Sequence, residues 1–221
     1  MTECCNPRGC DRFFGARFAA RVARRYRKDG LDQSARQMVD FLVERGIRDA
    51  TVLEVGGGVG EIQIELLKHG AARTVNLELS PGYEEQARQL LQEAGLADRA
   101  ERRIHNIAAD PAGVESADVV VLHRVVCCYP DYERLLSAAA DHTRRLLVFS
   151  YPPRNPASRF LLGSQNLIFR LLRWEFRVFT HPPGAMLAVL ERYGLRASYT
   201  ERGVVWRVSG LERSQAEAPA A

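Results

Sequence analysis

The spacing of the apolar residues changes near residue 50, and this change divides the chain into two parts. In the first part, large apolar side chains recur at every fourth position from about Asp11 to Lys28, which predicts an amphipathic helix that Gly30 ends. Asp32 follows as the expected N-cap of a second helix, which carries its apolar residues on one face. The first part is therefore expected to be helical.

The second part alternates short apolar runs with helical patterns. Two runs near 195–200 and 204–208, joined by a turn at 201–203, predict a terminal hairpin. Five earlier runs predict strands at 51–55, 74–79, 102–107, 117–122 and 145–151. The fourth of these ends in four consecutive apolar residues, which is typical of a strand buried on both faces. The alternation predicts an α/β fold with a mostly parallel sheet that helices cover on both faces.

One predicted helix differs from the others in its apolarity. It begins at Asn155-Pro156 and extends to about Arg173, with eight large apolar residues along it. We expect it to cover a ligand site or to join the core rather than to anchor the chain in a membrane.

These patterns suggest a single domain with short additions. The domain proper spans 31–213 and contains the apolar insert at about 152–183. The segment 1–30 precedes it, with three cysteines and the basic helix. The small, polar residues 214–221 are expected to form a disordered tail.

Composition limits the class of protein. The 221 residues, 46% hydrophobic and 26% charged, suit one globular domain and argue against global disorder. The N-terminus shows no apolar signal-peptide core, and no apolar run reaches the roughly 20 residues that span a bilayer. The five cysteines cannot all pair within one chain, so we expect reduced thiols and a cytoplasmic protein rather than a secreted disulfide scaffold.

The positive charge is concentrated at the N-terminus. The net charge is +4, and residues 1–30 alone hold eight basic against three acidic side chains. The remainder is nearly neutral, which gives little reason to expect nucleic acid as a partner. We expect the basic helix to be a lid that packs its apolar stripe on the core. The alternatives are attraction of an anionic substrate, peripheral contact with a membrane surface, or nucleic acid.

The segment most informative about chemistry is TVLEVGGGVG at 51–60, where a strand leads through glycines into a helix. In this context a glycine-rich turn lets the backbone approach a nucleotide-like ligand. Its glycines fall at 56, 58 and 60, whereas a dinucleotide fingerprint would place one at 61, where this chain has Glu61. Glu78 ends the next strand, where its carboxylate can accept hydrogen bonds from both hydroxyls of a ribose.

TVLEVGGGVG at 51–60 and VNLELSP at 75–81 resemble the first two motifs of the class I methyltransferases that use S-adenosylmethionine. The resemblance covers about residues 50–150. It implies a Rossmann-like three-layer sandwich with a seven-stranded, mostly parallel sheet, an antiparallel last strand and an N-terminal helical lid. It also implies S-adenosylmethionine as cofactor and S-adenosylhomocysteine as product.

The resemblance assigns cofactor contacts position by position. Glu54 matches the acidic residue that helps to hold the amino end of the methionine moiety, and Glu78 matches the ribose ligand. Leu79 and Ile107 are expected beside the adenine ring, and Asn106 stands where the family usually has an acidic residue for the adenine amino group. The loop under the methionine moiety is matched by Gly56, Gly57, Gly58 and Gly60.

The sequence indicates the methyl acceptor less clearly than it indicates the cofactor. The stretch 119–129 lacks the Asn-Pro-Pro-Tyr type of motif found in enzymes that methylate exocyclic base nitrogens, and it is closer to the small-molecule branch. Together with the apolar insert, this stretch is weakly similar to the magnesium-protoporphyrin O-methyltransferases. The insert predicts a small hydrophobic or aromatic acceptor.

Three side chains are candidates for a catalytic role: His123, Tyr129 and His181. A general base is needed only if the acceptor arrives protonated and poorly acidic. His123 is best placed, but it is also explained as a residue that caps the strand or lines the cofactor site, and His181 as a loop residue before a proline pair. Tyr26, on the lid helix, is a candidate to reach the cofactor carboxylate.

The cysteines are the candidates for a metal site. If the N-terminal segment folds over the cofactor site, its thiols approach the central pair, and the full set is Cys4, Cys5, Cys10, Cys127 and Cys128. Such thiolates would bind zinc, another soft ion or a thiophilic substrate, and a disulfide is a third interpretation. The spacing CCxxxxC is not the usual zinc-knuckle spacing, and free cysteine is often a buried small hydrophobe.

Two alternative functions therefore stand beside methyl transfer to a small molecule. One is thiolate-based binding or methylation of a metal or metalloid. The other is a catalytically silent regulatory module that binds S-adenosylmethionine. The sequence leaves the oligomeric state open.

Overall fold

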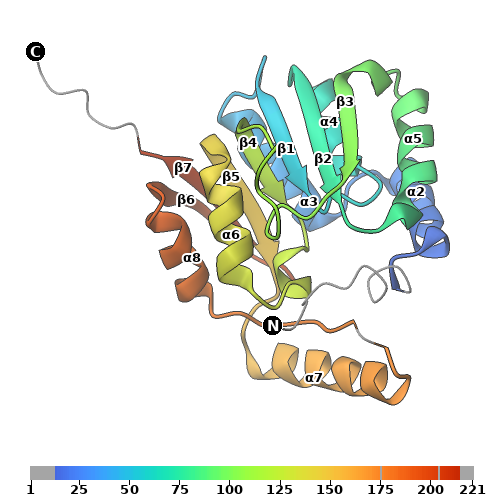
Figure 1. Ribbon diagram of the computed structural model, residues 1–221, viewed down its shortest axis with the longest axis vertical. Coiled ribbons are helices and arrows are strands. Elements are labelled where there is room, and N and C mark those ends of the chain that lie inside the picture. The colour runs from blue at the N-terminus through green and yellow to red at the C-terminus, as the bar shows by residue number, and fades with distance from the viewer. Residues whose placement is uncertain (1–12, 175, 204, 215–221) are drawn as a thin grey trace, which may run out of the picture.

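Figure 1 shows one twisted sheet with helices packed on both of its faces. The computed structural model describes residues 13–174, 176–203 and 205–214. The strands are β1 (Thr51–Val55), β2 (Arg73–Glu78), β3 (Ala100–Ile104), β4 (Ala117–Leu122), β5 (Thr143–Tyr151), β6 (Leu195–Arg202) and β7 (Arg207–Arg213). The α-helices are α2 (Ala16–Asp29), α3 (Gln33–Glu44), α4 (Glu61–Lys68), α5 (Glu84–Glu93), α6 (Tyr132–Asp141), α7 (Pro156–Leu171) and α8 (Pro183–Glu191). Short 3-10 helices are η1 (Pro81–Tyr83), η2 (Ala97–Arg99) and η3 (Val126–Cys128).

The sheet has seven strands in the order β3-β2-β1-β4-β5-β7-β6. Strands β1 to β5 run parallel, and β7 runs antiparallel to both β5 and β6. The predicted Rossmann-like α/β fold, with a mostly parallel sheet and an antiparallel last strand, is confirmed. The strand order reverses between β1 and β4, and such a switch point opens a crevice at the carboxyl ends of the strands.

Strand β4 shows how the three layers are built. Val119 and Val121 lie in the cluster formed with α3 and α4, whereas Val120 and Leu122 lie in the cluster formed with α6 and α8. All four side chains are fully buried. The unbroken apolar run therefore forms a strand covered on both faces, as predicted.

The two N-terminal helices form as predicted, although α2 begins at Ala16 rather than near residue 11. Gly15 has an extended backbone, which separates α2 from the residues before it. The Asp32 side chain accepts a hydrogen bond from the Ala35 N–H at 3.1 Å, which confirms it as the N-cap of α3.

Five strands have ends that differ from the prediction, and the differences are largest for β3 and β7. β3 stops at Ile104, so the residues after it lie in a loop. β7 spans 207–213 rather than 204–208, because its pairing with β5 continues through Gly210. A glycine interrupts the apolar pattern in the sequence, but here it is required, since a Cβ on it would approach the Phe41 ring to 2.5 Å.

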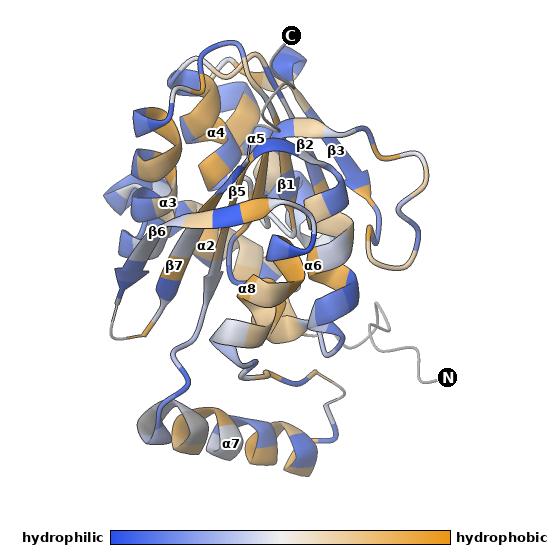
Figure 2. Ribbon diagram, turned by 90° about the vertical axis from the view of Figure 1, so that its left-hand side faces the viewer, coloured by the Kyte–Doolittle hydropathy of each residue, from blue (hydrophilic) through white to orange (hydrophobic). Residues whose placement is uncertain are grey.

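Helix α7 forms where it was predicted, but it does not join the core. Asn155 caps it by accepting a hydrogen bond from the Ser158 N–H at 2.8 Å. Figures 1 and 2 show that α7 stands at one end of the molecule, away from the sheet. Its large apolar side chains are mostly exposed, with Phe160 at 79% and Leu171 at 74%. Of the two expected roles, the role in the core is therefore wrong for this face, and the cover over a ligand site stays a prediction. Within the described residues, no helix is long and apolar enough to cross a membrane.

Candidate active site

A cavity of about 230 Å³ lies at the carboxyl ends of β1, β2 and β4, where the strand order reverses. The loops after these strands supply its floor, and residues of α2 and the segment before it supply part of its wall. This is the place where ligands bind in open α/β sheets.

The loop after β1 lies against this cavity in an unusual backbone conformation. Gly56, Gly58 and Gly60 all have left-handed φ angles, of 66°, 56° and 81°. Only glycine adopts this region without strain. Gly57 is required for a different reason, because a Cβ on it would lie 2.1 Å from Asn76 Nδ2. Gly60 does not line the cavity; it is the N-cap of α4.

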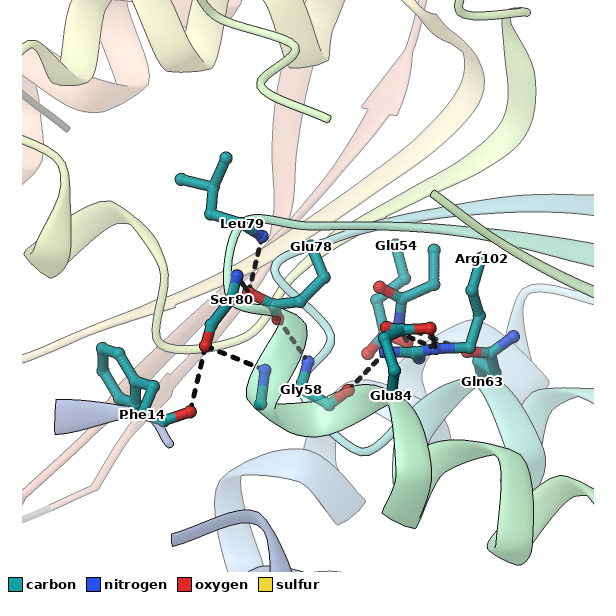
Figure 3. Close-up of polar contacts among 11 residues, drawn as sticks. Phe14, Glu54, Gly58, Gln63, Glu78, Leu79, Ser80, Glu84 and Arg102 are labelled. Atoms are coloured by element: carbon teal, nitrogen blue, oxygen red, sulfur yellow. Dashed lines mark hydrogen bonds and ion pairs between the residues drawn. The ribbon is translucent and has the colours of Figure 1, made fainter. Parts of the chain in front are cut away.

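Glu78 fixes this loop from the neighbouring strand. Its Oε2 accepts a hydrogen bond from the Gly58 N–H at 2.9 Å, and its Oε1 accepts from the Leu79 N–H at 2.7 Å and the Ser80 N–H at 3.0 Å (Figure 3). The carboxylate is therefore held in one orientation at the cavity wall. Oε1 already accepts two hydrogen bonds, whereas Oε2 accepts one and retains acceptor capacity, so a hydrogen bond from a ribose hydroxyl to Oε2 suits this geometry.

Arg102 supports the same loop, and the sequence motifs did not indicate it. Its side chain is only 8% exposed, and its Nη2 donates to the Gly58 carbonyl and to Glu84 Oε1, both at 2.8 Å (Figure 3). Because Arg102 is bound to Glu84 as well as to the Gly58 carbonyl, it restricts the movement of the loop.

Glu54 and Glu61 place two further carboxyl groups beside the cavity. Glu54 is 1% exposed, and its Oε2 accepts a hydrogen bond from Asn76 Nδ2 at 3.1 Å. Burial, together with the charge of Glu61, raises the pKa of Glu54 to about 8. Burial also raises the pKa of Glu61. A cationic ligand beside these two carboxyl groups would favour their ionised form and so lower their pKa values.

The cavity therefore fits S-adenosylmethionine on three structural grounds. Its carboxyl groups suit the ammonium and sulfonium charges, its glycine loop allows close approach of a ligand, and Glu78 presents fixed acceptor oxygens. Glu54 and the loop would hold the methionine moiety, and Glu78 would hold the ribose.

Leu79, Asn106 and Ile107 all line the cavity, as the resemblance to methyltransferases predicts. Asn106 Oδ1 already accepts hydrogen bonds from the Ala108 N–H at 3.1 Å and the Ala109 N–H at 3.3 Å. The amide thus caps the turn after β3, and its contact with the adenine amino group stays a prediction.

The His123 side chain is 9% exposed, directly follows β4 and lines the cavity. Its Nε2 lies 3.0 Å from Ser34 Oγ, and Ser34 Oγ donates to Asp32 Oδ1 at 2.8 Å. Because the hydroxyl gives its single proton to Asp32, the imidazole proton is assigned to Nε2, which leaves Nδ1 as an acceptor. Burial and the charge of Arg124 lower the pKa of His123 to about 3, so the ring is neutral near pH 7.

Arg124 is a cavity residue that the sequence interpretation missed. Its φ is 59°, a strained value for a side chain other than glycine. Its Nη2 lies 2.9 Å from Asp32 Oδ2, its backbone N–H donates to Ser150 Oγ at 2.8 Å, and its guanidinium lies 4.8 Å from the centre of the Trp206 ring. These contacts hold the strained backbone in place.

The other two catalytic candidates occupy different positions. Tyr129 is 9% exposed and lines the cavity, with its Oη 3.5 Å from Asn106 Oδ1. His181 does not line the cavity, because its Nε2 lies 3.1 Å from the Val126 carbonyl and 3.0 Å from the Tyr129 carbonyl. The structure therefore gives His181 the role of a loop residue that donates to the backbone.

Tyr26 also lies elsewhere than predicted. Its hydroxyl donates to Glu65 Oε1 at 2.5 Å, on the outer side of α4, and it does not line the cavity. Burial and the hydrogen bond to Glu65 raise its pKa. Arg25, the preceding residue, lines the cavity instead, because one step along a helix turns the side chain by about 100°. Helix α2 thus reaches the cavity through Phe18, Val22 and Arg25 rather than through Tyr26.

The candidate metal set is only partly described. The Sγ atoms of Cys127 and Cys128 lie 3.7 Å apart, and Cys128 lines the cavity. Cys4, Cys5 and Cys10 lie outside the described residues. Among the residues that the structure describes, no three His, Cys, Asp or Glu side chains gather to hold a metal ion.

The comparisons with known proteins agree with this site. A family model described as a methyltransferase domain matches residues 23–198. No curated protein matches the sequence.

Three solved structures illustrate the similarity of fold. Magnesium protoporphyrin IX methyltransferase from Synechocystis PCC 6803, crystallised with S-adenosylhomocysteine, aligns with a TM-score of 0.73 at 19% identity, over 95% of this chain and 100% of that one. An O-methyltransferase family protein from Burkholderia thailandensis aligns with a TM-score of 0.67 at 21% identity, over 90% of this chain and 59% of that one. A TehB-like methyltransferase from Corynebacterium glutamicum aligns with a TM-score of 0.62 at 17% identity, over 95% and 100%.

At such low identity the solved structures establish a shared fold, whereas the family model covers most of the chain and carries the assignment. The protein belongs to the methyltransferase domain family and is an S-adenosylmethionine-dependent methyltransferase.

Proposed function

We propose that this enzyme methylates a small hydrophobic or aromatic acceptor. The observation that carries the proposal is the apolar wall of the cavity beside the glycine loop. Phe14, Phe18 and Val22 reach it from the N-terminal lid, and Val125 and Tyr129 reach it from the loop after β4. Apolar and aromatic walls with few polar groups select ligands of the same character.

The lid itself is held by aromatic contacts. The Phe14 ring lies 5.1 Å from the ring of Phe176 and 6.2 Å from that of Tyr83, centre to centre. The Ser80 hydroxyl donates to the Phe14 carbonyl at 3.1 Å (Figure 3). These contacts place Phe14 over the site, where it excludes water from the acceptor and restricts its orientation.

The chemistry requires little more than alignment. S-adenosylmethionine supplies a methyl group on a sulfonium centre, and the acceptor displaces it in line. Glu54 and Glu78 position the donor, and the aromatic wall positions the acceptor. The neutral His123 is available to accept a hydrogen bond at Nδ1 from a protonated acceptor.

A panel of acceptors tests the proposal. Formation of S-adenosylhomocysteine is measured with phenols, aromatic carboxylates, amines, thiols and arsenite, each at matched concentration. Arsenite is included because the thiols of Cys127 and Cys128 lie together, with Cys128 at the cavity. We expect turnover on phenols or other apolar aromatic acceptors. Turnover only on small hydrophilic acceptors, or only on arsenite, would contradict the proposal.

Calorimetry tests the cofactor site separately from the acceptor. We expect Glu78→Gln to weaken S-adenosylmethionine binding by about 10- to 100-fold, because a charged acceptor of hydrogen bonds is lost. Glu115→Gln is the matched control, since the Glu115 side chain is 74% exposed and distant from the cavity. Equal binding by both variants would show that Glu78 does not hold the ribose.

A further inference from the structure

The apolar stripe of α7 faces outward, which is the reverse of the usual arrangement in a globular protein. The exposed apolar residues of the stripe are separated mainly by four, seven or eight positions, so they lie on one face of the helix. The exposed residues are Phe160 (79%), Leu161 (65%), Leu167 (53%), Ile168 (54%), Leu171 (74%) and Leu172 (53%). Figure 2 shows α7 standing off from the body of the protein, with apolar segments along it.

The opposite face of α7 is fixed to the protein, so the outward direction of the stripe is determined by contacts. Phe169 is 6% exposed, and its ring stacks on Trp174 at 5.3 Å and lies 5.5 Å from the Phe13 ring. Asn166 Oδ1 accepts from the Val178 N–H at 2.9 Å, and its Nδ2 donates to the Val178 carbonyl at 2.7 Å. These bonds prevent the helix from turning its stripe inward without losing a buried ring and two hydrogen bonds.

The charged residues of the segment 152–174, which contains α7, are all basic. Residues 152–174 contain no aspartate or glutamate. Arg154, Arg170 and Arg173 are exposed at the two ends of α7. An apolar face bordered by arginines matches the interface of a bilayer that contains anionic lipids, where the apolar side chains enter the acyl boundary and the arginines contact phosphate groups.

A second copy of the chain suits this surface less well. A two-fold symmetric contact would place the same patch on both sides, so the arginines of one copy would face the arginines of the other. No acidic residue within 152–174 offsets that repulsion. The charge therefore favours an anionic lipid surface over self-association.

We propose that α7 binds the surface of membranes containing anionic phospholipids, lying in the interface without spanning it. The stripe supplies the apolar contact, and the arginines supply selectivity for negative charge. The site is separate from the cavity, because α7 contributes no residue to the cavity lining among the described residues. The proposal is therefore independent of the identity of the acceptor.

Vesicle flotation of the full-length protein tests it. Vesicles of phosphatidylcholine with about one third phosphatidylglycerol are compared with pure phosphatidylcholine. We expect binding to the anionic vesicles alone, weakened by salt. Phe160→Ser with Leu171→Ser should reduce that binding by about tenfold or more. The matched control is Ile104→Ser with Val205→Ser, which removes exposed apolar side chains elsewhere (53% and 63% exposed) and should bind as the wild type does.

The charge is tested with Arg→Gln variants. Replacing Arg154, Arg170 and Arg173 together should weaken binding by roughly fivefold for each arginine. Replacing three exposed arginines of α2 is the control: Arg17, Arg21 and Arg24. An equal loss in both triple variants would show general charge attraction and overturn the assignment to α7.

Three other outcomes would also overturn the proposal. The first is the absence of vesicle binding by the wild type, and the second is equal binding by the apolar variant. The third is a concentration-dependent dimer that the apolar variant abolishes while vesicle binding is unchanged. Retained binding of S-adenosylmethionine shows that each variant is folded.

Discussion

Ser34 Oγ lies 3.0 Å from His123 Nε2, although the two residues are 89 positions apart in the chain. The contact joins the first turn of α3 to the end of β4, beside the methyl-transfer cavity. Because Ser34 donates to Asp32, it accepts from His123 and so sets which imidazole nitrogen carries the proton. A serine in a helix N-terminal turn thus controls the protonation pattern of a buried histidine.

We expect Ser34→Ala to release this constraint. In the wild type, nitrogen NMR should show His123 neutral with its proton on Nε2 from pH 8 down to about pH 5, given a pKa of about 3. In the variant, both tautomers should appear, and the free energy of unfolding should fall by about 1–3 kcal/mol because buried polar groups lose a partner. His123→Asn identifies the signal among the five histidines.

Ser164→Ala is the matched control for this change. The Ser164 hydroxyl donates to the Phe160 carbonyl at 2.9 Å within α7, away from the cavity. Its loss should leave the His123 signals unchanged. An unaltered His123 spectrum in Ser34→Ala would show that the serine does not set the tautomer.

The buried carboxyl of Glu54 should make stability depend on pH. Its pKa of about 8 in the folded protein exceeds the value of about 4.5 for a free glutamate, so the folded state binds more protons between these values. The stabilising contribution of the protonated group is complete below about pH 4.5 and is lost as the pH rises to 8. Chemical denaturation from pH 5 to 9 should show this decline, with a slope of at most about 1.4 kcal/mol per pH unit. Glu54→Gln should flatten it.

The affinity for the cofactor should also depend on the protonation of Glu54, but it should rise with pH where the stability falls. A cationic ligand prefers the carboxylate, so affinity for S-adenosylmethionine should rise from pH 6 to 8, with release of a proton near pH 7. Calorimetry in two buffers of different ionisation enthalpy measures that release. Glu115→Gln should behave as the wild type, and proton release that persists in Glu54→Gln would assign it to another group.

Gly57 provides a steric test of the loop. A Cβ at this position would lie 2.1 Å from Asn76 Nδ2 and 2.4 Å from Glu54 Oε2, inside a buried hydrogen bond. We expect Gly57→Ala to lower the free energy of unfolding by about 2–4 kcal/mol and to weaken cofactor binding at least tenfold. Thermal unfolding and calorimetry measure the two effects.

Gly163→Ala is the matched control for the added methyl group. It lies inside α7 with no atom within 4 Å of the added Cβ, so the variant should be as stable as the wild type or up to about 1 kcal/mol more stable. Equal stability of both alanine variants would mean that the loop adapts and that Gly57 is not required.

Tyr26 distinguishes a structural tyrosine from a cofactor ligand. Its hydroxyl is bound to Glu65 at 2.5 Å, outside the cavity. Tyr26→Phe should therefore lower the free energy of unfolding by about 1 kcal/mol and change the dissociation constant of S-adenosylmethionine by less than twofold. A tenfold weaker affinity in a variant of normal stability would return Tyr26 to the cofactor site.

Local sequence determined much of the architecture. The apolar run that ends at Leu122 specified a strand covered on both faces, and Asp32 specified the start of α3. The glycines at 56, 58 and 60, with Glu78 one β-α unit later, specified the cofactor loop. These features depend on backbone conformation and on side chains within one turn or one strand, so they can be predicted from neighbouring residues.

Tertiary structure decided which distant side chains meet and which way each helix faces. Arg102 reaches Gly58 across 44 positions, and Ser34 reaches His123 across 89. The apolar period of α7 was visible in the sequence, but its outward direction follows from the contacts of Phe169 and Asn166. Periodicity predicts that a helix has an apolar face, whereas only packing against other elements decides what that face contacts.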